Sequence, residues 1–325
     1  MYMKDILLEH KKEFLLNLLN NNYSKETIYN YERDLSLFEL FLSDRFIDFK
    51  NITKQDIVFF KDFLRTGEYI KILKNDKSVI HNFAKDNKGE LSSRSINRVL
   101  SSLRSYIKYL IDFELFTPIS PEVIKLIKTE KKNSQVAELN DLIRLIEFPT
   151  FYEKNEFVKS RNRAILETLF STGMRISELV SLNRDQINDD GKIYVLGKGK
   201  KQRFVYLTER SKKYIFEYLS LREDNMSALF IPTRGGRLGN VNNRISTNYI
   251  QERISFYRKK IGIVVPTSAH SLRHGFATYL AEDGASPVAI QILLGHESLQ
   301  TTNKYVHASD KYAEESHKKF HPLTQ

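Results

Sequence analysis

The sequence predicts a mainly helical protein with a small β-hairpin, an α+β fold divided into two domains. Three observations predict this fold class. Most of the first third places apolar residues at helical spacing. Residues 192–207, KIYVLGKGKKQRFVYL, form two β-rich runs joined by Gly and Lys, a pattern typical of a hairpin. Residues 117–139 contain two prolines and a Lys-rich polar run, which indicate a linker between domains.

The helices of the first third have clear start signals. Ser24 is a candidate N-cap, and Thr53 followed by Asp56 has the capping-box spacing. The first of these helices has its apolar face at Ile28, Tyr31, Leu35, Phe38 and Leu42, and a later one at Ile96, Val99, Leu103, Ile107 and Leu110. Residues 66–90 have no clean period, so we expect an inserted loop or hairpin there.

The second region mixes helices with the hairpin. Residues 161–182 predict two helical segments broken at Gly173, and further helices are expected near 243–263, 269–280 and 286–296. We therefore divide the chain into a helical domain 1–117 with the insertion 66–90, a basic linker 118–137, a second domain 138–310 and a tail 311–325.

The composition restricts the function classes. The 325 residues include 51 Lys and Arg against 40 Asp and Glu, with 19 basic and 17 acidic residues in 1–117 and 32 and 23 in 118–325. This basic surplus favours a polyanionic partner. The absence of cysteine excludes disulfides, zinc–thiolate sites and thiol nucleophiles. Because no apolar run approaches 18 residues, we expect a cytoplasmic protein without a membrane partner.

The stretch AHSLRHGFATYL, residues 269–280, carries polar groups that need an explanation. His270 and His274 have the spacing of a zinc-binding HExxH helix, but Ser271 replaces the required Glu and Arg273 would repel a dication. A core-helix interpretation explains the apolar residues but not the pair formed by His270 and Arg273. That pair suits a phosphate or carboxylate, because Arg offers a planar fork of donors and His exchanges a proton near neutral pH.

Residues of the same chemistry recur where the predicted elements break. Arg175 follows a helix break, Lys198 lies in the hairpin turn, His296 follows a helix-ending Gly, and Tyr305 lies in a short polar segment. With His270 and Arg273 they supply the groups for phosphoryl transfer without a metal ion or cofactor. The segment LGKGKKQR lacks the spacing of a nucleotide-binding loop.

The boxes TGMRISEL, GKGKKQR, HSLRHGFATYL and LLGHESLQTTNKYVH resemble the signature of the tyrosine recombinase family, also called the phage integrase family. The order of the six residues matches, as do the 23 residues from Arg273 to His296 and the nine from His296 to Tyr305. The tail EESHKKFHPL further resembles the Xer subgroup.

The resemblance implies a role for each matching residue in cutting and rejoining DNA through a 3′-phosphotyrosyl bond, without metal or ATP. Tyr305 would be the nucleophile, His270 its base, and Lys198 the acid for the departing 5′-oxygen. Arg175, Arg273 and His296 would bind the scissile phosphate, and Glu178 matches a supporting acidic position.

The resemblance also implies an architecture and partners. A helical core-binding (SAM-like) domain and a catalytic domain would form a C-shaped clamp around a double-stranded recombination site, with the protein associated with the nucleoid. Four chains would act on two sites, joined through the tail 311–325, and an accessory protein that activates catalysis is a further candidate partner. Arg94, Asn97 and Arg98 are the candidate DNA contacts of the first domain.

Several functions stay open at this point. The biological task of a site-specific recombinase could be chromosome or plasmid dimer resolution, or integration and excision of a mobile element. A type IB topoisomerase shares the chemistry but rejoins the same strand, and a catalytically silent DNA-binding relative is a third alternative. A hydrolytic nuclease is disfavoured because no carboxylate cluster for metal ions is visible.

Overall fold

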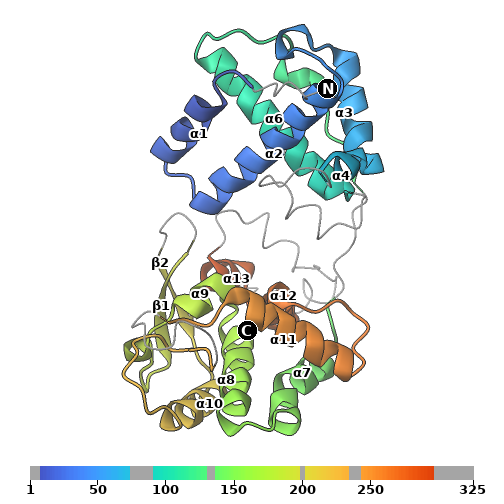
Figure 1. The fold of residues 1–325 in the computed structure, drawn as a ribbon. Coiled ribbons are helices and arrows are strands. Elements are labelled where there is room, and N and C mark those ends of the chain that lie inside the picture. The colour runs from blue at the N-terminus through green and yellow to red at the C-terminus, as the bar shows by residue number, and fades with distance from the viewer. Residues whose placement is uncertain (1–7, 74–90, 130–135, 198–201, 234–242, 296–325) are drawn as a thin grey trace, which may run out of the picture. The chain divides into compact units, whose positions relative to one another are not determined.

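The chain folds as two compact units, which the computed structural model describes over residues 8–73, 91–129, 136–197, 202–233 and 243–295 (Figure 1). The division falls between Lys132 and Asn133, inside the predicted linker 118–137. Each unit has its own hydrophobic core. Within these ranges, no helix is both long enough and apolar enough to cross a membrane.

The first unit is a helical bundle in which α2 and α6 pack against each other. Both predicted start signals are confirmed, because Ser24 Oγ accepts the Thr27 amide and Thr53 and Asp56 form a reciprocal capping box. The helices are α1 (Lys11–Asn20), α2 (Lys25–Asp44), α3 (Lys54–Thr66), α4 (Glu68–Leu73) and α6 (Ser93–Asp112), with single 3-10 turns at Phe49–Asn51 and Pro121–Val123.

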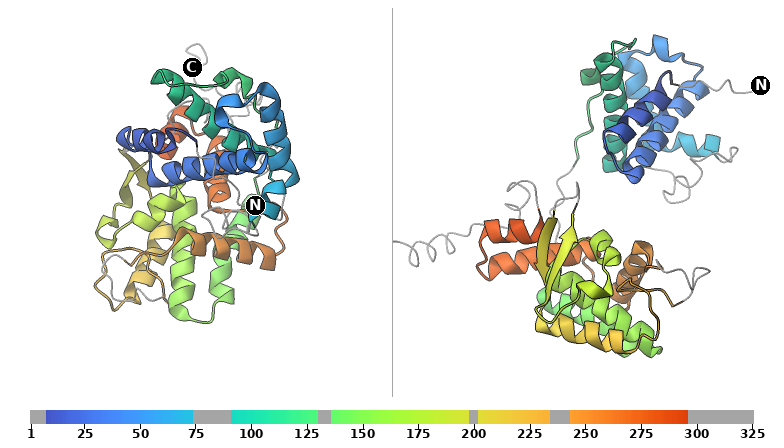
Figure 2. Two further views of the ribbon diagram at one scale, coloured as in Figure 1. Left: turned by 45° about the horizontal axis from the view of Figure 1, so that its top comes forward. Right: turned by 90° about the vertical axis from the view of Figure 1, so that its left-hand side faces the viewer.

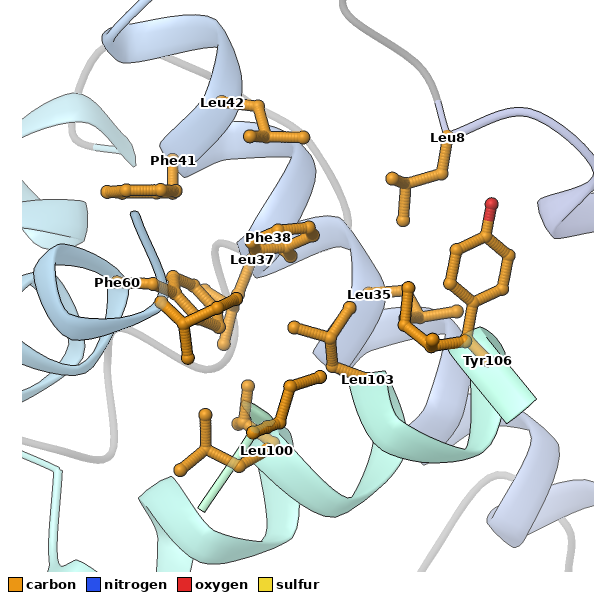
Figure 3. Close-up of a cluster of buried hydrophobic side chains, with 14 of the residues drawn as sticks. Leu8, Leu35, Leu37, Phe38, Phe41, Leu42, Phe60, Leu100, Leu103 and Tyr106 are labelled. Atoms are coloured by element: carbon orange, nitrogen blue, oxygen red, sulfur yellow. The ribbon is translucent and has the colours of Figure 1, made fainter. Parts of the chain in front are cut away.

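Aromatic rings fill the core between α2, α3 and α6 (Figure 3). Phe38 and Phe41 of α2 meet Phe60 of α3 with ring centroids 4.8 and 5.3 Å apart, and all three side chains are fully buried. On α6, Leu103 and Tyr106 belong to the same core. Burial of each such side chain contributes about 1.5–3 kcal/mol, so the helical period seen in the sequence is also the source of the unit's stability.

The structure corrects the expectation of a loop or hairpin at the start of residues 66–90. Gly67 ends α3 with a left-handed φ of 73°, and α4 begins at the next residue. Tyr69 on α4 is fully buried in the core, so this short helix is held by packing although its sequence lacks a clean period. Residues 74–90 lie outside the described part.

The start of the predicted linker packs on the first unit. Ile119 and Ile124 are buried in its core, and the Asn97 side chain on α6 bonds both the backbone N–H and the carbonyl of Ile127. The chain up to Ile127 is therefore attached to α6.

The second unit is built around α8, against which α7, α10 and α12 pack (Figure 1). The predicted helix break is confirmed, because α8 ends at Thr172 and Gly173 takes a left-handed φ of 58°. The elements are α7 (Leu139–Tyr152), α8 (Glu156–Thr172), α9 (Ile176–Ser181), a 3-10 turn (Arg184–Gln186), β1 (Lys192–Leu196), β2 (Gln202–Tyr206), α10 (Glu209–Ser220), α11 (Thr247–Lys260), α12 (Ala269–Glu282) and α13 (Pro287–Leu294).

The predicted hairpin is also confirmed. β1 and β2 pair antiparallel, with Tyr194 opposite Phe204. Alternate residues face the core, so Val195 and Arg203 are buried while their neighbours along each strand are exposed. The hairpin lies against α13 (Figure 2).

Candidate active site

Arg175 stands at the sharp connection between α8 and α9. Gly173 makes this connection possible, since a Cβ at this position would lie 2.3 Å from the Phe276 ring of α12. Met174 follows and is fully buried, which fixes the backbone that leads into Arg175. The Arg175 side chain remains 35% exposed and can reach a ligand in solvent.

The Glu178 carboxylate holds Arg175 in this position. One oxygen, Oε2, accepts the Arg175 backbone N–H at 2.7 Å, and Oε1 accepts Arg175 Nη1 at 3.0 Å. Burial opposes the negative charge of Glu178, but the hydrogen bonds from Arg203 and Arg175 and their positive charges outweigh it, so the pKa of Glu178 lies below its ordinary value. Glu178 is therefore ionised at neutral pH and orients Arg175, as the sequence predicts for a supporting residue.

Arg203, which the sequence analysis did not select, binds the same carboxylate. Its Nη1 and Nη2 donate to Oε1 and Oε2 of Glu178 at 2.8 and 2.7 Å, a bidentate pair in which both side chains are almost fully buried. The signal in the sequence was the alternation of β2, which puts Arg203 on the same face as the buried Val205. A charged residue on a core-facing position needs a partner.

Arg273 lies on α12 and is only 4% exposed. Its guanidinium donates from Nη1 to the Gly173 carbonyl at 2.8 Å and from Nη2 to the Leu294 carbonyl at 2.6 Å. These bonds connect α12 with the break that precedes Arg175 and with the last turn of α13. The structure thereby brings the segments of two predicted phosphate-binding residues together.

His270 lies one turn before Arg273 on the same helix and reaches solvent. Its pKa is below the ordinary value of 6.5, because partial burial and the nearby charges of Arg273, His274 and Arg175 disfavour the imidazolium. His270 is therefore neutral at pH 7 and able to accept a proton. His274, the second histidine of the rejected zinc-binding pattern, interacts through Nδ1 with Thr278 Oγ1 at 3.2 Å.

Three of the six predicted catalytic residues lie outside the described residues: Lys198, His296 and Tyr305. The described chain leads to two of them. β1 ends at Leu196 and β2 begins at Gln202, on either side of Lys198, and Gly295 ends α13 with a left-handed φ of 63° one residue before His296. The predicted tail 311–325 also lies outside this part.

The three predicted DNA contacts of the first unit differ in their surroundings. Arg94 is exposed on the first turn of α6, whereas Asn97 is bonded to the Ile127 backbone. Arg98 binds the buried carboxylate of Asp34, whose pKa is raised by burial although Arg98 and Ser102 partly offset this effect. Contacts with DNA through these residues stay a prediction, with Arg94 the most accessible.

Comparison with known proteins identifies the family. The chain matches the phage integrase family over residues 136–312 and the phage integrase N-terminal SAM-like domain over residues 12–71. The tyrosine recombinase XerC of Pelobacter propionicus is 34% identical over 320 residues, which cover 97% of this chain and 96% of that protein. The tyrosine recombinase XerD of Staphylococcus epidermidis is 32% identical over 282 residues, 83% of this chain and 90% of that protein.

Solved structures of the same fold include a XerH site-specific recombinase bound to a palindromic difH substrate, with a TM-score of 0.66 and 21% identity. That match covers 98% of this chain and 91% of the other. A lambda integrase dimer bound to a core site has the same TM-score at 16% identity, covering 91% of this chain and 75% of the other. With its family matches and its two full-length or nearly full-length relatives, this chain belongs to the phage integrase family and is a tyrosine recombinase of the Xer kind, an enzyme that breaks and rejoins DNA.

Proposed function

We propose that this site-specific recombinase cuts DNA with Tyr305 at a phosphate held by Arg175 and Arg273, with His270 as the base. One observation carries the proposal: the side chain of Arg273 bonds the carbonyl of Gly173, two residues before Arg175, while both arginines act electrostatically on His270. Two guanidiniums and a neutral imidazole, from α12 and from the connection between α8 and α9, are therefore neighbours in the second unit.

These groups match the needs of phosphoryl transfer by a tyrosine. In the proposed step, Tyr305 Oη forms a bond to phosphorus and the bond to the 5′-oxygen breaks. The Tyr305 proton passes to His270, and Lys198 gives a proton to the departing oxygen. Because an ordinary tyrosine has a pKa near 10, nearby cations are needed to activate it. Attack by a 5′-hydroxyl of the partner strand reverses the step and releases the enzyme.

The task we propose is strand exchange between two sites by four copies of the chain, with residues 311–325 contacting a neighbouring copy. The relatives that cover 97% and 83% of the chain are named XerC and XerD recombinases, which favours recombination over relaxation of supercoils by a topoisomerase. Resolution of chromosome or plasmid dimers is the Xer-like form of this task, and it places the protein at the nucleoid.

The test is the formation of a covalent complex between protein and DNA. The probe is a duplex whose sequence the wild-type chain selects from a randomised pool. A nick beside the cleavage site lets the short fragment with the 5′-hydroxyl dissociate after cleavage, so that the covalent complex accumulates. Without added metal or ATP, wild type should give a slow-migrating adduct on a denaturing gel. Tyr305→Phe should give none, because the nucleophilic oxygen is missing.

A matched control is Tyr152→Phe, which makes the same change at a 42% exposed side chain at the end of α7. It should form the adduct at the wild-type rate. An adduct with Tyr305→Phe, or its loss with Tyr152→Phe alone, would show that the nucleophile is assigned wrongly.

A further inference from the structure

We propose that Arg203 is a positioning residue for DNA cleavage, which keeps the charge of Arg175 available to the scissile phosphate. This inference rests on the proposed function and extends it to a residue outside the six predicted catalytic positions. Arg203 is not expected to touch DNA itself, because its side chain is only 6% exposed.

The first argument is the charge balance around Glu178. Its two oxygens accept four hydrogen bonds, two from Arg203 and two from Arg175, one of them from the Arg175 backbone. If Arg175 were the only cation, it would form a neutral pair with Glu178 and gain little by binding a phosphate. With Arg203 present, the three groups carry one net positive charge, which lies on the more exposed guanidinium, Arg175.

The second argument is geometric. Arg203 occupies both oxygens of Glu178 as a fork, so Arg175 forms its side-chain bond with Oε1 through a single nitrogen, Nη1. A bidentate pair between Arg175 and Glu178 would occupy two N–H groups on one edge of the Arg175 guanidinium and leave fewer donors for a phosphate. Arg203 therefore prevents Glu178 from forming a bidentate pair with the guanidinium of Arg175.

The third argument is the position of Arg203 between three elements. From β2 its Nε donates to the Leu293 carbonyl at 2.9 Å, beside the Leu294 carbonyl that Arg273 binds. A Cβ on Gly295 would lie 2.8 Å from Arg203 Cδ, so the turn that ends α13 is fitted against this side chain. Arg203 thus ties the hairpin and the end of α13 to the carboxylate that orients Arg175.

The experiment measures single-turnover cleavage of the nicked duplex by wild type, Arg203→Gln and the double variant Glu178→Gln/Arg203→Gln. Arg203→Gln leaves Glu178 with Arg175 as its counter-ion, and we expect cleavage to slow by about 10- to 100-fold, the usual effect of losing an orienting partner. The double variant removes the unbalanced charge, and the amide oxygen that Glu178→Gln leaves can still accept a bond from Arg175, so it should recover part of that loss. A merely structural role predicts the opposite, since the double variant breaks more contacts than the single one.

The matched control is Arg222→Gln. Arg222 is similarly buried in the same unit, binds Asp224 through two nitrogens and donates to the carbonyls of Ala228 and Leu229. Its loss should lower the thermal unfolding temperature about as much as the loss of Arg203. Cleavage at a temperature where all variants are folded should stay within about 3-fold of wild type, because Arg222 binds neither Glu178 nor Arg175.

A second substrate separates the outcomes. A neutral methylphosphonate at the scissile position needs no cation to offset a charged oxygen, so the defect of Arg203→Gln should shrink on this duplex. The positioning role is wrong if Arg203→Gln slows cleavage equally on both substrates, or if the double variant cleaves more slowly than Arg203→Gln. In either case the wild-type adduct would still support the proposed function. Failure of the wild type to form an adduct would instead contradict the proposed function, and with it this inference.

Discussion

Arg175 and Arg273 are predicted to bind the same phosphate, yet the fold uses them differently. Arg273 is 4% exposed and donates to the carbonyls of Gly173 and Leu294, whereas Arg175 is 35% exposed and its side chain donates to Glu178. A buried carbonyl that loses its donor costs about 1–3 kcal/mol. Arg273 therefore contributes to folding as well as to the site, while Arg175 is mainly presented to a ligand.

The lowered pKa of His270 gives the cleavage rate a predictable dependence on pH. His270 accepts a proton only when neutral, and burial together with its neighbours Arg273, His274 and Arg175 keeps its pKa below 6.5. The single-turnover rate should fall at acid pH, as His270 becomes protonated, with a midpoint below 6.5. The measurement is a pH–rate profile on the nicked duplex, with DNA binding checked at each pH.

An independent measurement follows the His270 ring by NMR in the absence of DNA. Its titration midpoint should lie below 6.5 and should coincide with the acid limb of the profile. Assignment by the His270→Gln spectrum identifies the signal. A midpoint above 6.5 would contradict the role of the surrounding cations, and a limb that does not follow the midpoint would contradict His270 as the base.

Single residues also show how far the sequence can predict this site. Arg175, Glu178, His270 and Arg273 could be selected because each lies in a family box at a fixed spacing. Arg203 lies in such a box too, but its partner Glu178 is 25 residues earlier on another element. No local pattern links a strand position to a helix position, so this contact required the folded chain.

At the scale of elements, the connection from α8 to α9 determines the site. The sequence predicted this break because Gly173 interrupts two helical segments, and it predicted the hairpin because two β-rich runs are joined by Gly and Lys. It missed α4, where Tyr69 is held by long-range packing in a segment without a helical period. Gly173 and the caps at Ser24 and Thr53 were sufficient local signals, whereas Gly67 was not sufficient to predict α4, because tertiary packing holds this helix.

Replacing Gly173 by Ala should damage both stability and cleavage. The left-handed φ of 58° costs an L-residue about 1–2 kcal/mol, and the new methyl group would meet the Phe276 ring at 2.3 Å, adding about 1–3 kcal/mol of overpacking. Urea unfolding should therefore show a loss of about 2–5 kcal/mol for the second unit. Cleavage should also slow, because Arg273 binds the carbonyl of this residue.

Gly262→Ala is the matched control for this prediction. Gly262 has a φ of 77° in the same unit, but a Cβ there would meet nothing within 4 Å. This variant isolates the backbone cost and should lose only about 1–2 kcal/mol. If the two glycine variants are equally stable, the contact with the Phe276 ring is not the cause of the loss. The same holds if the losses of unfolding free energy of Gly173→Ala and Phe276→Ala simply add in the double variant.

At the scale of the whole molecule, each unit has its own core and its own net charge, and the two net charges differ. Up to Lys132 it has 23 basic and 19 acidic residues, and from Asn133 on it has 28 and 21. Both units have a basic surplus, which is larger in the unit that holds the candidate active site. Composition and linker chemistry could predict this division because each core is formed by residues close together in the chain. They could not predict that the linker is anchored to α6 as far as Ile127, since that depends on the Asn97 side chain.

Separating the units should retain both folds and lose most of the DNA affinity. Fragments 1–132 and 133–325 each contain a complete core, so circular dichroism should show helical spectra and a cooperative thermal transition for both.

If both units contact one duplex, joining them converts the second contact into an intramolecular one. Fluorescence anisotropy at fixed salt should then show the full chain binding the selected duplex about 10²- to 10⁴-fold more tightly than either fragment. The affinity of 133–325 should decrease with added salt, because its basic residues displace counter-ions from the phosphates. A folded fragment that binds as tightly as the full chain would instead assign recognition to one unit and leave the other without a role in holding DNA.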